Sequence, residues 1–280
     1  RSLRIEHKTL RWTGRKPTTG IQEAARAARY RLLGGAALKA NGAPVVTAHT
    51  QDDQAETVLF RLMRGSGIAG LSGMRFGNLL PGHEPERLML LRPLLRVPKA
   101  RLVATLEAAK IPYAEDPSNH DPRFARPRLR ELMPLLAAEG LTAERLERLA
   151  TRVRRAEMTL HEVLSAALLN LAPAPWPDQG PVVIDAGRFG QMPDEIGLRM
   201  LERIINHVGN EGPAELGKLE GLCGALVDAF GGGRFRRTLA GAVVTLHRDK
   251  ITVERAPARK SPPNERATKR AMKKPALKRP

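Results

Sequence analysis

The stretch from Val45 to Met74 constrains the fold of this chain most, because an apolar run leads almost directly into a helix rich in carboxylates. Residues 44–48 (PVVTA) predict a short buried strand, and residues 52–64 predict a helix with apolar side chains at the spacing of one helix face. That face comprises Ala55, Val58, Leu59, Leu62 and Met63. Gly65 is expected to end the helix. A strand followed by a helix indicates an α/β protein, in which ligands bind beyond the carboxyl ends of parallel strands.

Four polar side chains at this junction, His49, Asp52, Asp53 and Glu56, are therefore expected to face the ligand crevice. Three carboxylates together could hold Mg²⁺ or an ammonium group. The alternative is structural: Asp53 caps the helix and Glu56 completes a D-x-x-E capping box, both favoured by the helix dipole. The residues alone leave both interpretations open.

Three blocks of sequence resemble one family. The string HTQDDQAET, followed by LMRGSG and GLSGM, is similar to the tRNA(Ile)-lysidine synthetases, ATP-dependent tRNA-modifying ligases with a PP-loop fold. The strings LLRPLLRVPKARL (residues 90–102) and IPYAEDPSNHDPRFARPRLR (residues 111–130) follow in the order and spacing of that family, and WTGRKPTTGIQEAARAARYRLL fits upstream. The resemblance is close over residues 1–134 and loose beyond them. Pro127 stands where the family usually has Asn.

One family motif is not found in these 280 residues. PP-loop enzymes carry an SGGxDS-type loop whose backbone N–H groups hold the phosphates of ATP, and no such string occurs here. The chain also begins with Arg1. We therefore expect the sequence to be N-terminally incomplete, and the fragment alone to bind ATP poorly. A noncatalytic tRNA-binding remnant of the enzyme is accordingly one alternative.

The length and charge of the chain indicate two domains and a polyanionic partner. The sequence has 280 residues and a net charge of +18, typical of proteins that bind RNA. We predict a partial PP-loop domain with a parallel sheet over residues 1–135, lacking its first strands. A helical to α+β tRNA-binding domain is predicted over residues 136–256, and a basic disordered tail over residues 257–280. Because neither a membrane-spanning run nor a signal peptide is evident, the predicted location is cytoplasmic.

Other elements follow from local patterns. A helix over residues 19–38 is expected to begin with a capping box of Thr19 and Gln22, and a helix over residues 141–171 with Thr142 as its N-cap. Cys223, the only cysteine, lies in an apolar helical pattern that indicates a buried structural thiol. The remaining expected elements are a strand at 87–91, a helix at 98–110, a proline-rich loop at 112–134, a strand at 182–184, helices at 194–208 and 213–230, and short strands within 235–253.

Several basic residues are candidates for binding phosphate. Arg26 and Arg29 are spaced i, i+3 on the first helix, and the resemblance implies that Arg29 reaches phosphate or the reacting base. A solvated helix face is the alternative. The resemblance also implies substrate or phosphate contacts for a further set, of which Arg64 would equally complement the dipole at its helix end. This set comprises His49, Arg64, Arg92 and Lys99.

The proline-rich loop combines arginines with one aromatic residue, a pattern that favours contacts with an RNA backbone and a stacked base. Its acidic and amide residues equally suit Asx turns and a helix cap. The predicted tRNA-binding residues are Asp116, Ser118, Asn119, Arg123, Phe124, Arg126 and Arg130.

The resemblance implies a two-step reaction. ATP adenylates the C2 oxygen of the wobble cytidine in the CAU anticodon of an isoleucine tRNA, and the ε-amine of free lysine then displaces AMP to give lysidine. Asp53 and Glu56 would bind the lysine ammonium, position Mg²⁺ or accept a proton, with Asp52 in support. ATP, Mg²⁺, lysine and the tRNA are thus the expected ligands, and homodimer formation stays open. A tRNA-thiolating PP-loop enzyme is a further alternative, which the single cysteine argues against.

Overall fold

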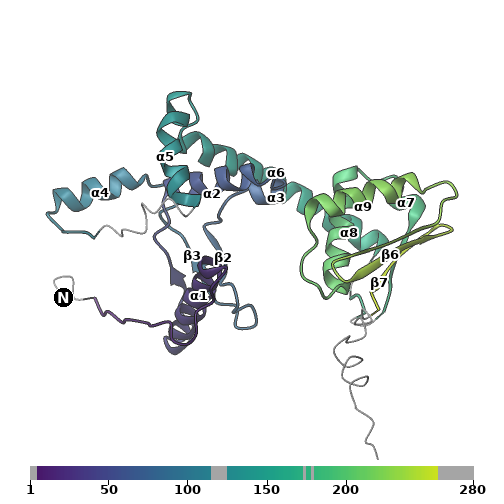
Figure 1. Ribbon diagram of the computed structural model, residues 1–280, viewed down its shortest axis with the longest axis horizontal. Helices are drawn as coiled ribbons and strands as arrows, with labels where there is room; N and C mark the ends of the chain where they lie inside the picture. Colours follow the sequence, from purple (N-terminus) through teal and green to yellow (C-terminus); the bar gives the residue numbers. More distant parts are fainter. Residues whose placement is uncertain (1–4, 115–124, 173–174, 178–179, 258–280) are drawn as a thin grey trace, which may run out of the picture. The chain divides into compact units, whose positions relative to one another are not determined.

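A computed structural model describes residues 5–114, 125–172, 175–177 and 180–257 (Figure 1). The chain divides into two compact units, residues 1–159 and residues 160–280, which are treated separately below. The division falls inside helix α6 (Ala143–Leu171), so this one helix belongs to both units. The sequence-based domain limits at residues 135 and 256 stay predictions. Within the described residues, no helix is both long and apolar enough to span a bilayer.

The first unit contains a small mixed sheet in the order β1-β3-β2. Strand β1 (Val45–Val46) runs parallel to β3 (Met89–Leu91), and β2 (Gly77–Leu79) is antiparallel to β3. Both strands expected from the sequence therefore exist but are shorter. Helix α1 (Ile21–Lys39) contributes to the core of this layer (Figure 1). That core comprises Tyr30, Ala37, Val45, Leu80, Leu88 and Leu90.

The start of α1 corrects one prediction. The helix begins at Ile21 after Gly20, which adopts a left-handed conformation (φ 65°), and its first turn has no side-chain cap. The predicted capping box of Thr19 and Gln22 is therefore wrong. A left-handed residue immediately before the helix turns the chain away from the extended backbone that a Thr19 cap requires.

A second layer of the first unit is helical. It comprises α2 (Gln51–Met63), α3 (Ile68–Leu71), α4 (Lys99–Ala108), α5 (Ala125–Ala138) and the first part of α6. The predicted proline-rich loop thus ends in a helix, α5. Thr142 caps α6 as predicted, since its Oγ1 accepts a hydrogen bond from the Arg145 N–H at 3.2 Å.

The core between α2, α5 and α6 consists of Ala55, Val58, Leu59, Leu129, Leu146 and Ala150. The apolar face predicted for α2 is buried only as far as Leu59. Leu62 and Met63, near the end of the helix, are 49% and 66% exposed and lie outside the core that α2 forms with α5 and α6.

The second unit has an antiparallel sheet in the order β4-β7-β6-β5. Its core combines side chains of the sheet and of four helices, among them the last part of α6, as expected for a small α+β unit. Burial raises the pKa of the half-buried Cys223 to about 12, which makes it an unreactive thiol. The elements are β4 (Val182–Asp185), α7 (Ala186–Gly190), α8 (Asp194–Val208), α9 (Leu216–Asp228), β5 (Phe235–Leu239), β6 (Ala242–His247) and β7 (Lys250–Arg255).

Candidate active site

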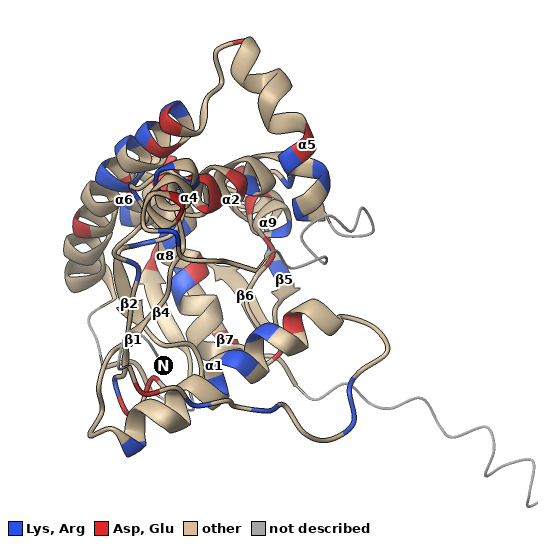
Figure 2. Ribbon diagram, turned by 90° about the vertical axis from the view of Figure 1, so that its left-hand side faces the viewer, with Lys and Arg blue, Asp and Glu red and all other residues tan. Residues whose placement is uncertain are grey.

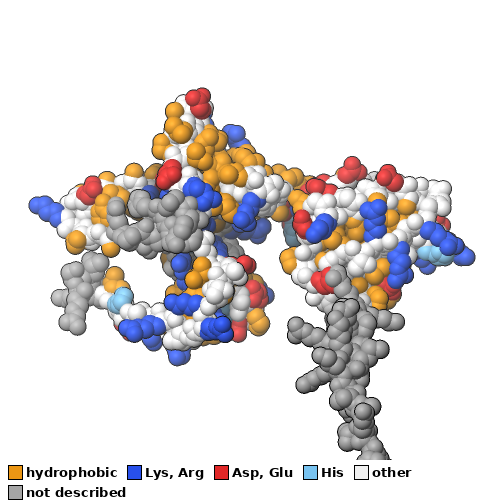
Figure 3. All heavy atoms as spheres, in the orientation of Figure 1, with side chains coloured by type: hydrophobic (Ala, Val, Ile, Leu, Met, Phe, Trp, Pro, Cys, Tyr) orange, Lys and Arg blue, Asp and Glu red, His pale blue; other side chains and the backbone are white. Residues whose placement is uncertain are grey.

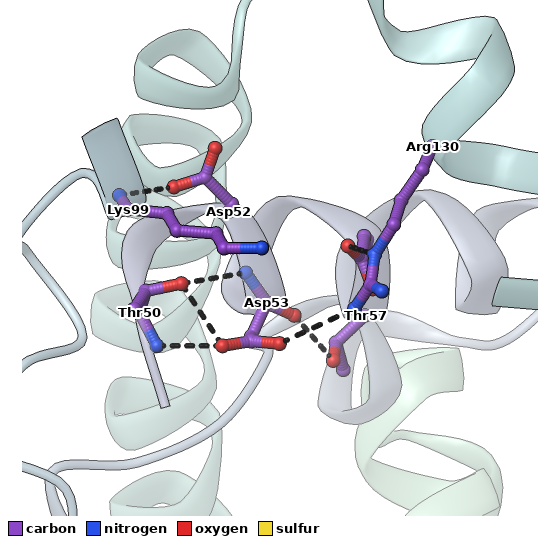
Figure 4. Close-up of polar contacts among 7 residues, drawn as sticks. Thr50, Asp52, Asp53, Thr57, Lys99 and Arg130 are labelled. Atoms are coloured by element: carbon purple, nitrogen blue, oxygen red, sulfur yellow. Dashed lines mark hydrogen bonds and ion pairs between the residues drawn. The ribbon is translucent and has the colours of Figure 1, made fainter. Parts of the chain in front are cut away.

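The start of α2 is organised by Thr50 and Asp53. Thr50 is the N-cap: its Oγ1 accepts a hydrogen bond from the Asp53 N–H, and the Asp53 Oδ2 accepts one from the Thr50 N–H at 2.8 Å (Figure 4). The Thr50 hydroxyl also lies 2.9 Å from Asp53 Oδ2. A capping box therefore exists, but one turn earlier than the predicted pair of Asp53 and Glu56. The box fixes Asp53 and leaves Glu56 available for another contact.

Asp52 points toward a different helix. Its Oδ2 accepts a hydrogen bond from the backbone N–H of Lys99 at 2.7 Å, at the first residue of α4 (Figure 4). The neighbouring Gln51 N–H donates to the carbonyl of Val97 at 3.0 Å. The starts of α2 and α4 are thereby joined.

Glu56 is buried and paired with Arg130 of α5. The Arg130 Nε donates to Glu56 Oε1 at 2.5 Å and Nη2 lies 3.3 Å from Oε2, while Nη2 is 3.9 Å from Asp53 Oδ1. Burial raises the pKa of Glu56, although the contact with Arg130 opposes that shift. The same contact raises the pKa of Arg130. Arg130, predicted to lie in an RNA-binding loop, is instead a helical residue bonded to a carboxylate of the site.

These residues line a cavity of about 970 Å³. Its polar wall carries the three carboxylates, together with Thr50, Lys99, Arg130 and Glu131. Its apolar wall is formed by Ala48, Leu102, Val103, Leu106, Tyr113, Ala114, Pro127, Met133, Pro134, Ala137 and Ala143. In Figure 2, acidic residues on α2 are visible near α4.

His49 lies between β1 and α2. Its Nδ1 is 2.9 Å from the Thr47 hydroxyl. Burial lowers the pKa of His49, the Asp53 carboxylate raises it, and Arg92, Arg26 and Arg126 lower it. The neutral imidazole is therefore favoured.

Three side chains that sequence reasoning missed hold the glycine-rich loop from Gly65 to Gly77, which contains α3. The Gln54 amide donates to the carbonyl of Met74 at 3.0 Å and accepts from its N–H at 2.7 Å. Arg61 donates to the carbonyl of Gly70 at 2.6 Å, and Arg154 of α6 donates to that of Met74 at 3.0 Å. One feature of the sequence could have indicated these contacts. Gln54 stands among the apolar residues of α2, and a buried amide requires hydrogen-bond partners.

Four other predicted arginines lie on α1, after α2, after β3 and on α5, and Arg126 is close enough to Glu56 to oppose the rise in its pKa that burial causes. Arg29 is exposed on α1, and Arg64 stacks on the Phe60 ring at 4.3 Å. Arg92 is 4% exposed and donates to the carbonyl of Arg75 and to Asn78 Oδ1, at 3.0 and 2.5 Å. Arg126 is exposed on α5. The phosphate and RNA roles of these arginines stay predictions, and the remaining predicted tRNA-binding residues, Asp116, Ser118, Asn119, Arg123 and Phe124, lie outside the described residues.

The three carboxylates do not fit a common metal site. Among the residues that the structure describes, no three His, Cys, Asp or Glu side chains are grouped so that they could hold an ion. Asp52 accepts from Lys99, Asp53 from Thr50, and Glu56 from Arg130, so the three diverge.

The α/β fold and the polar residues beyond β1 define a PP-loop protein, and residues 1–136 match the family model for the PP-loop domain. Comparison with individual relatives identifies the family within the PP-loop proteins. The tRNA(Ile)-lysidine synthase of Rhodopseudomonas palustris is 51% identical over 268 residues, which cover 92% of this chain and 75% of the relative. Those of Bradyrhizobium diazoefficiens and Methylobacterium nodulans are 48% and 49% identical, covering 92% of this chain and 75% and 76% of the relatives. The chain belongs to the tRNA(Ile)-lysidine synthase family, as the sequence predicted.

Proposed function

We propose that this protein is the ligase that joins lysine to the wobble cytidine of the isoleucine tRNA with the CAU anticodon, and that the cavity at the start of α2 binds the lysine. The observation that carries the proposal is the cavity itself. Its lining presents Asp52, Asp53 and Glu56 from α2, and α4 and α5 contribute apolar side chains together with Lys99, Arg130 and Glu131. ATP use follows from membership of the PP-loop family.

Lysine matches both kinds of wall. Its ammonium groups favour carboxylates, and its four methylene groups favour contact with apolar side chains such as Leu102, Val103 and Leu106 of α4. A cavity of about 970 Å³ is larger than lysine alone requires, which leaves volume for a second group such as a nucleobase.

Asp53 is the carboxylate best placed to receive an ammonium group. Its Oδ2 is engaged by Thr50, whereas Oδ1 lies 3.9 Å from Arg130 Nη2, beyond hydrogen-bond distance. Glu56 is engaged through both oxygens by Arg130. We therefore assign the ammonium contact to Asp53, with Glu56 fixing Arg130 beside it.

The reaction proceeds in two steps. The C2 oxygen of the cytidine attacks the α-phosphorus of ATP, a P–O bond forms, and pyrophosphate leaves. The neutral ε-amine of lysine then attacks C2, the C2–O bond breaks, AMP leaves, and the amine loses a proton. Holding the amine in line with C2 speeds the second step, because the two reacting atoms are already close and correctly oriented. No step is assigned to Mg²⁺, because the described residues contain no group of three His, Cys, Asp or Glu side chains arranged to hold an ion.

The charge of the chain supports an RNA substrate. The net charge is +18, and Figure 3 shows Lys and Arg side chains spread over the visible surface of both units. Contacts with phosphate would supply affinity that falls steeply with salt. Arg126, exposed on α5, is a candidate for such a contact.

Calorimetric titration of the 280-residue chain with L-lysine tests the binding site. Asp53→Asn keeps an acceptor for the Thr50 cap but removes the charge, so we expect lysine affinity to fall by about tenfold or more. The matched control, Glu107→Gln on the far end of α4, should bind like the wild type. Nα-acetyl-lysine and 6-hydroxynorleucine, which each lack one amine, identify the group that Asp53 binds.

Transfer of radiolabelled lysine to an isoleucine tRNA transcript tests the reaction, using the protein as its cell produces it. We expect transfer that requires ATP and the CAU anticodon. A protein that binds the transcript but neither binds nor transfers lysine would instead be a noncatalytic tRNA-binding protein.

A further inference from the structure

Helix α4 lacks the usual means of holding its position. None of its ten residues, all of which the structure describes, is buried. Its N-cap is Pro98, which supplies no side-chain hydrogen bond to the first turn. Because a short helix is marginal in water without tertiary packing, α4 depends on contacts made at its ends.

Such contacts come from the start of α2. Asp52 Oδ2 accepts the N–H of Lys99 at 2.7 Å, and the Gln51 N–H donates to the Val97 carbonyl at 3.0 Å. Figure 4 shows Asp52 beside the backbone nitrogen of Lys99. Asp52 thus occupies the place of an N-cap side chain for a helix that begins 47 residues further along the chain. Its negative charge also complements the positive end of the α4 dipole.

The position of α4 affects the cavity directly. Leu102, Val103 and Leu106 of α4 form part of its apolar wall, and all three are half-buried. The three carboxylates Asp52, Asp53 and Glu56 of its polar wall come from α2. The hydrogen bond from Asp52 to α4 therefore joins the apolar wall of the cavity to the wall that carries the carboxylates.

We propose that Asp52 is a positioning residue: it caps α4 from α2 and so sets the distance between the apolar wall of the cavity and Asp53. This assignment rests on the proposed function in one respect, namely that lysine is the ligand that the two walls bind together. This gives Asp52 a role different from those of Asp53 and Glu56. The sequence alone did not divide the roles among the three carboxylates. In this role the oxygen acceptor of Asp52 matters more than its charge.

Amide hydrogen exchange in the ligand-free chain tests the cap. Asp52→Asn keeps a carbonyl oxygen that can accept the Lys99 N–H, whereas Asp52→Ala removes the acceptor. We expect exchange at residues 99–102 to accelerate about fivefold or more in the Ala variant and to stay within about twofold of the wild type in the Asn variant. Glu107→Gln, on the same helix, is the matched control, and peptides of α9 in the other unit serve as an internal reference for folding. Unchanged exchange in the Ala variant would overturn the proposal.

Lysine affinity supplies the second readout. A positioning role predicts that Asp52→Ala weakens lysine binding about three- to tenfold and that Asp52→Asn restores it to within about twofold of the wild type. Equal loss in both variants, with α4 exchange unchanged, would mean that Asp52 contacts the ligand directly and that the proposal is wrong. If the wild type binds no lysine, the proposed function fails, while the exchange result still decides whether Asp52 caps α4.

Discussion

Arg130 of α5 donates from Nε to Oε1 of Glu56 on α2 at 2.5 Å, although 74 residues separate the two in the sequence. The Glu56 side chain is only 4% exposed, and that of Arg130 is 36% exposed. A buried carboxylate is costly unless a cation compensates it, so this pair fixes α5 against the helix that carries the site.

Replacing Arg130 should therefore destabilise the protein strongly. Arg130→Met leaves Glu56 buried without its cation, and we expect the free energy of unfolding to fall by about 3 kcal/mol, measured by urea denaturation. The double variant Glu56→Gln with Arg130→Met should recover part of that loss, because no charge then stays buried. A double variant less stable than Arg130→Met alone would contradict this account of the pair.

The raised pKa of Glu56 predicts a pH dependence of stability. Since the folded pKa lies above the ordinary value of 4.5, the folded protein binds more protons than the unfolded chain between those two values. The contribution of Glu56 to stability should therefore decrease as pH rises from 4.5 through the folded pKa, and level off above it. Denaturation at a series of pH values, compared with Glu56→Gln, isolates this contribution. A wild-type curve parallel to that of the variant would show that the pKa is not raised.

His49 should respond to the charge of Asp53. Burial lowers the pKa of His49 and the Asp53 carboxylate opposes that shift, so Asp53→Asn should lower the pKa further. NMR titration of the imidazole signals measures this change, with His49→Gln to assign the resonance. Asp52→Asn is the matched control, because that carboxylate is turned toward α4. The interpretation is excluded if both variants shift the pKa equally.

The glycine-rich loop should tolerate a methyl group at one glycine but not at another. Gly65 and Gly73 both have positive φ, of 66° and 69°, but an added Cβ meets nothing within 4 Å at Gly65 and the Gln54 amide nitrogen at 2.7 Å at Gly73. We expect Gly65→Ala to cost about 1 kcal/mol for the backbone alone. Gly73→Ala should cost about 2 to 3 kcal/mol, because it also displaces Gln54 from Met74. Thermal denaturation compares the two, and equal losses would show that the Gln54 contact contributes nothing.

Arg154 should hold the same loop from α6. Its Nη2 donates to the carbonyls of Ser72 and Met74 at 2.9 and 3.0 Å. Arg154→Met leaves these carbonyls without that donor and should lower stability by about 1 to 3 kcal/mol, with faster amide exchange at residues 70–76. Arg155→Met, at the exposed neighbouring position, should change neither quantity. Faster exchange in both variants would point to α6 itself rather than to the contact of Arg154.

Several features that depend on local sequence were predicted correctly, although the cap of α1 was not. Helix α8 has the predicted limits, Asp194 and Val208, because its apolar residues recur on one face and pack on a sheet. Thr142 caps α6 as predicted, since an N-cap bonds within its own first turn. The resemblance of residues 1–134 to a family likewise needed only the order of residues, and the family comparison confirmed it.

Features that depend on competition between partners were not predictable. The sequence predicted a capping box of Asp53 with Glu56, whereas in the structure Asp53 pairs with Thr50 and Glu56 pairs with Arg130 of a distant helix. The exposed Leu62 and Met63 have the same periodicity as the buried residues of α2, and they differ in lying outside the core that α2 forms with α5 and α6.

The sequence by itself thus determined the family, the α/β character of the first unit and the carboxylate-rich helix at its site. Tertiary structure alone decided what each carboxylate contacts: Asp52 the start of α4, Asp53 the Thr50 cap and Glu56 the Arg130 guanidinium. The physical reason is that a carboxylate accepts any donor within reach, and the donors that reach Asp52 and Glu56 come from helices 47 and 74 residues away. Packing of those helices selects one donor for each.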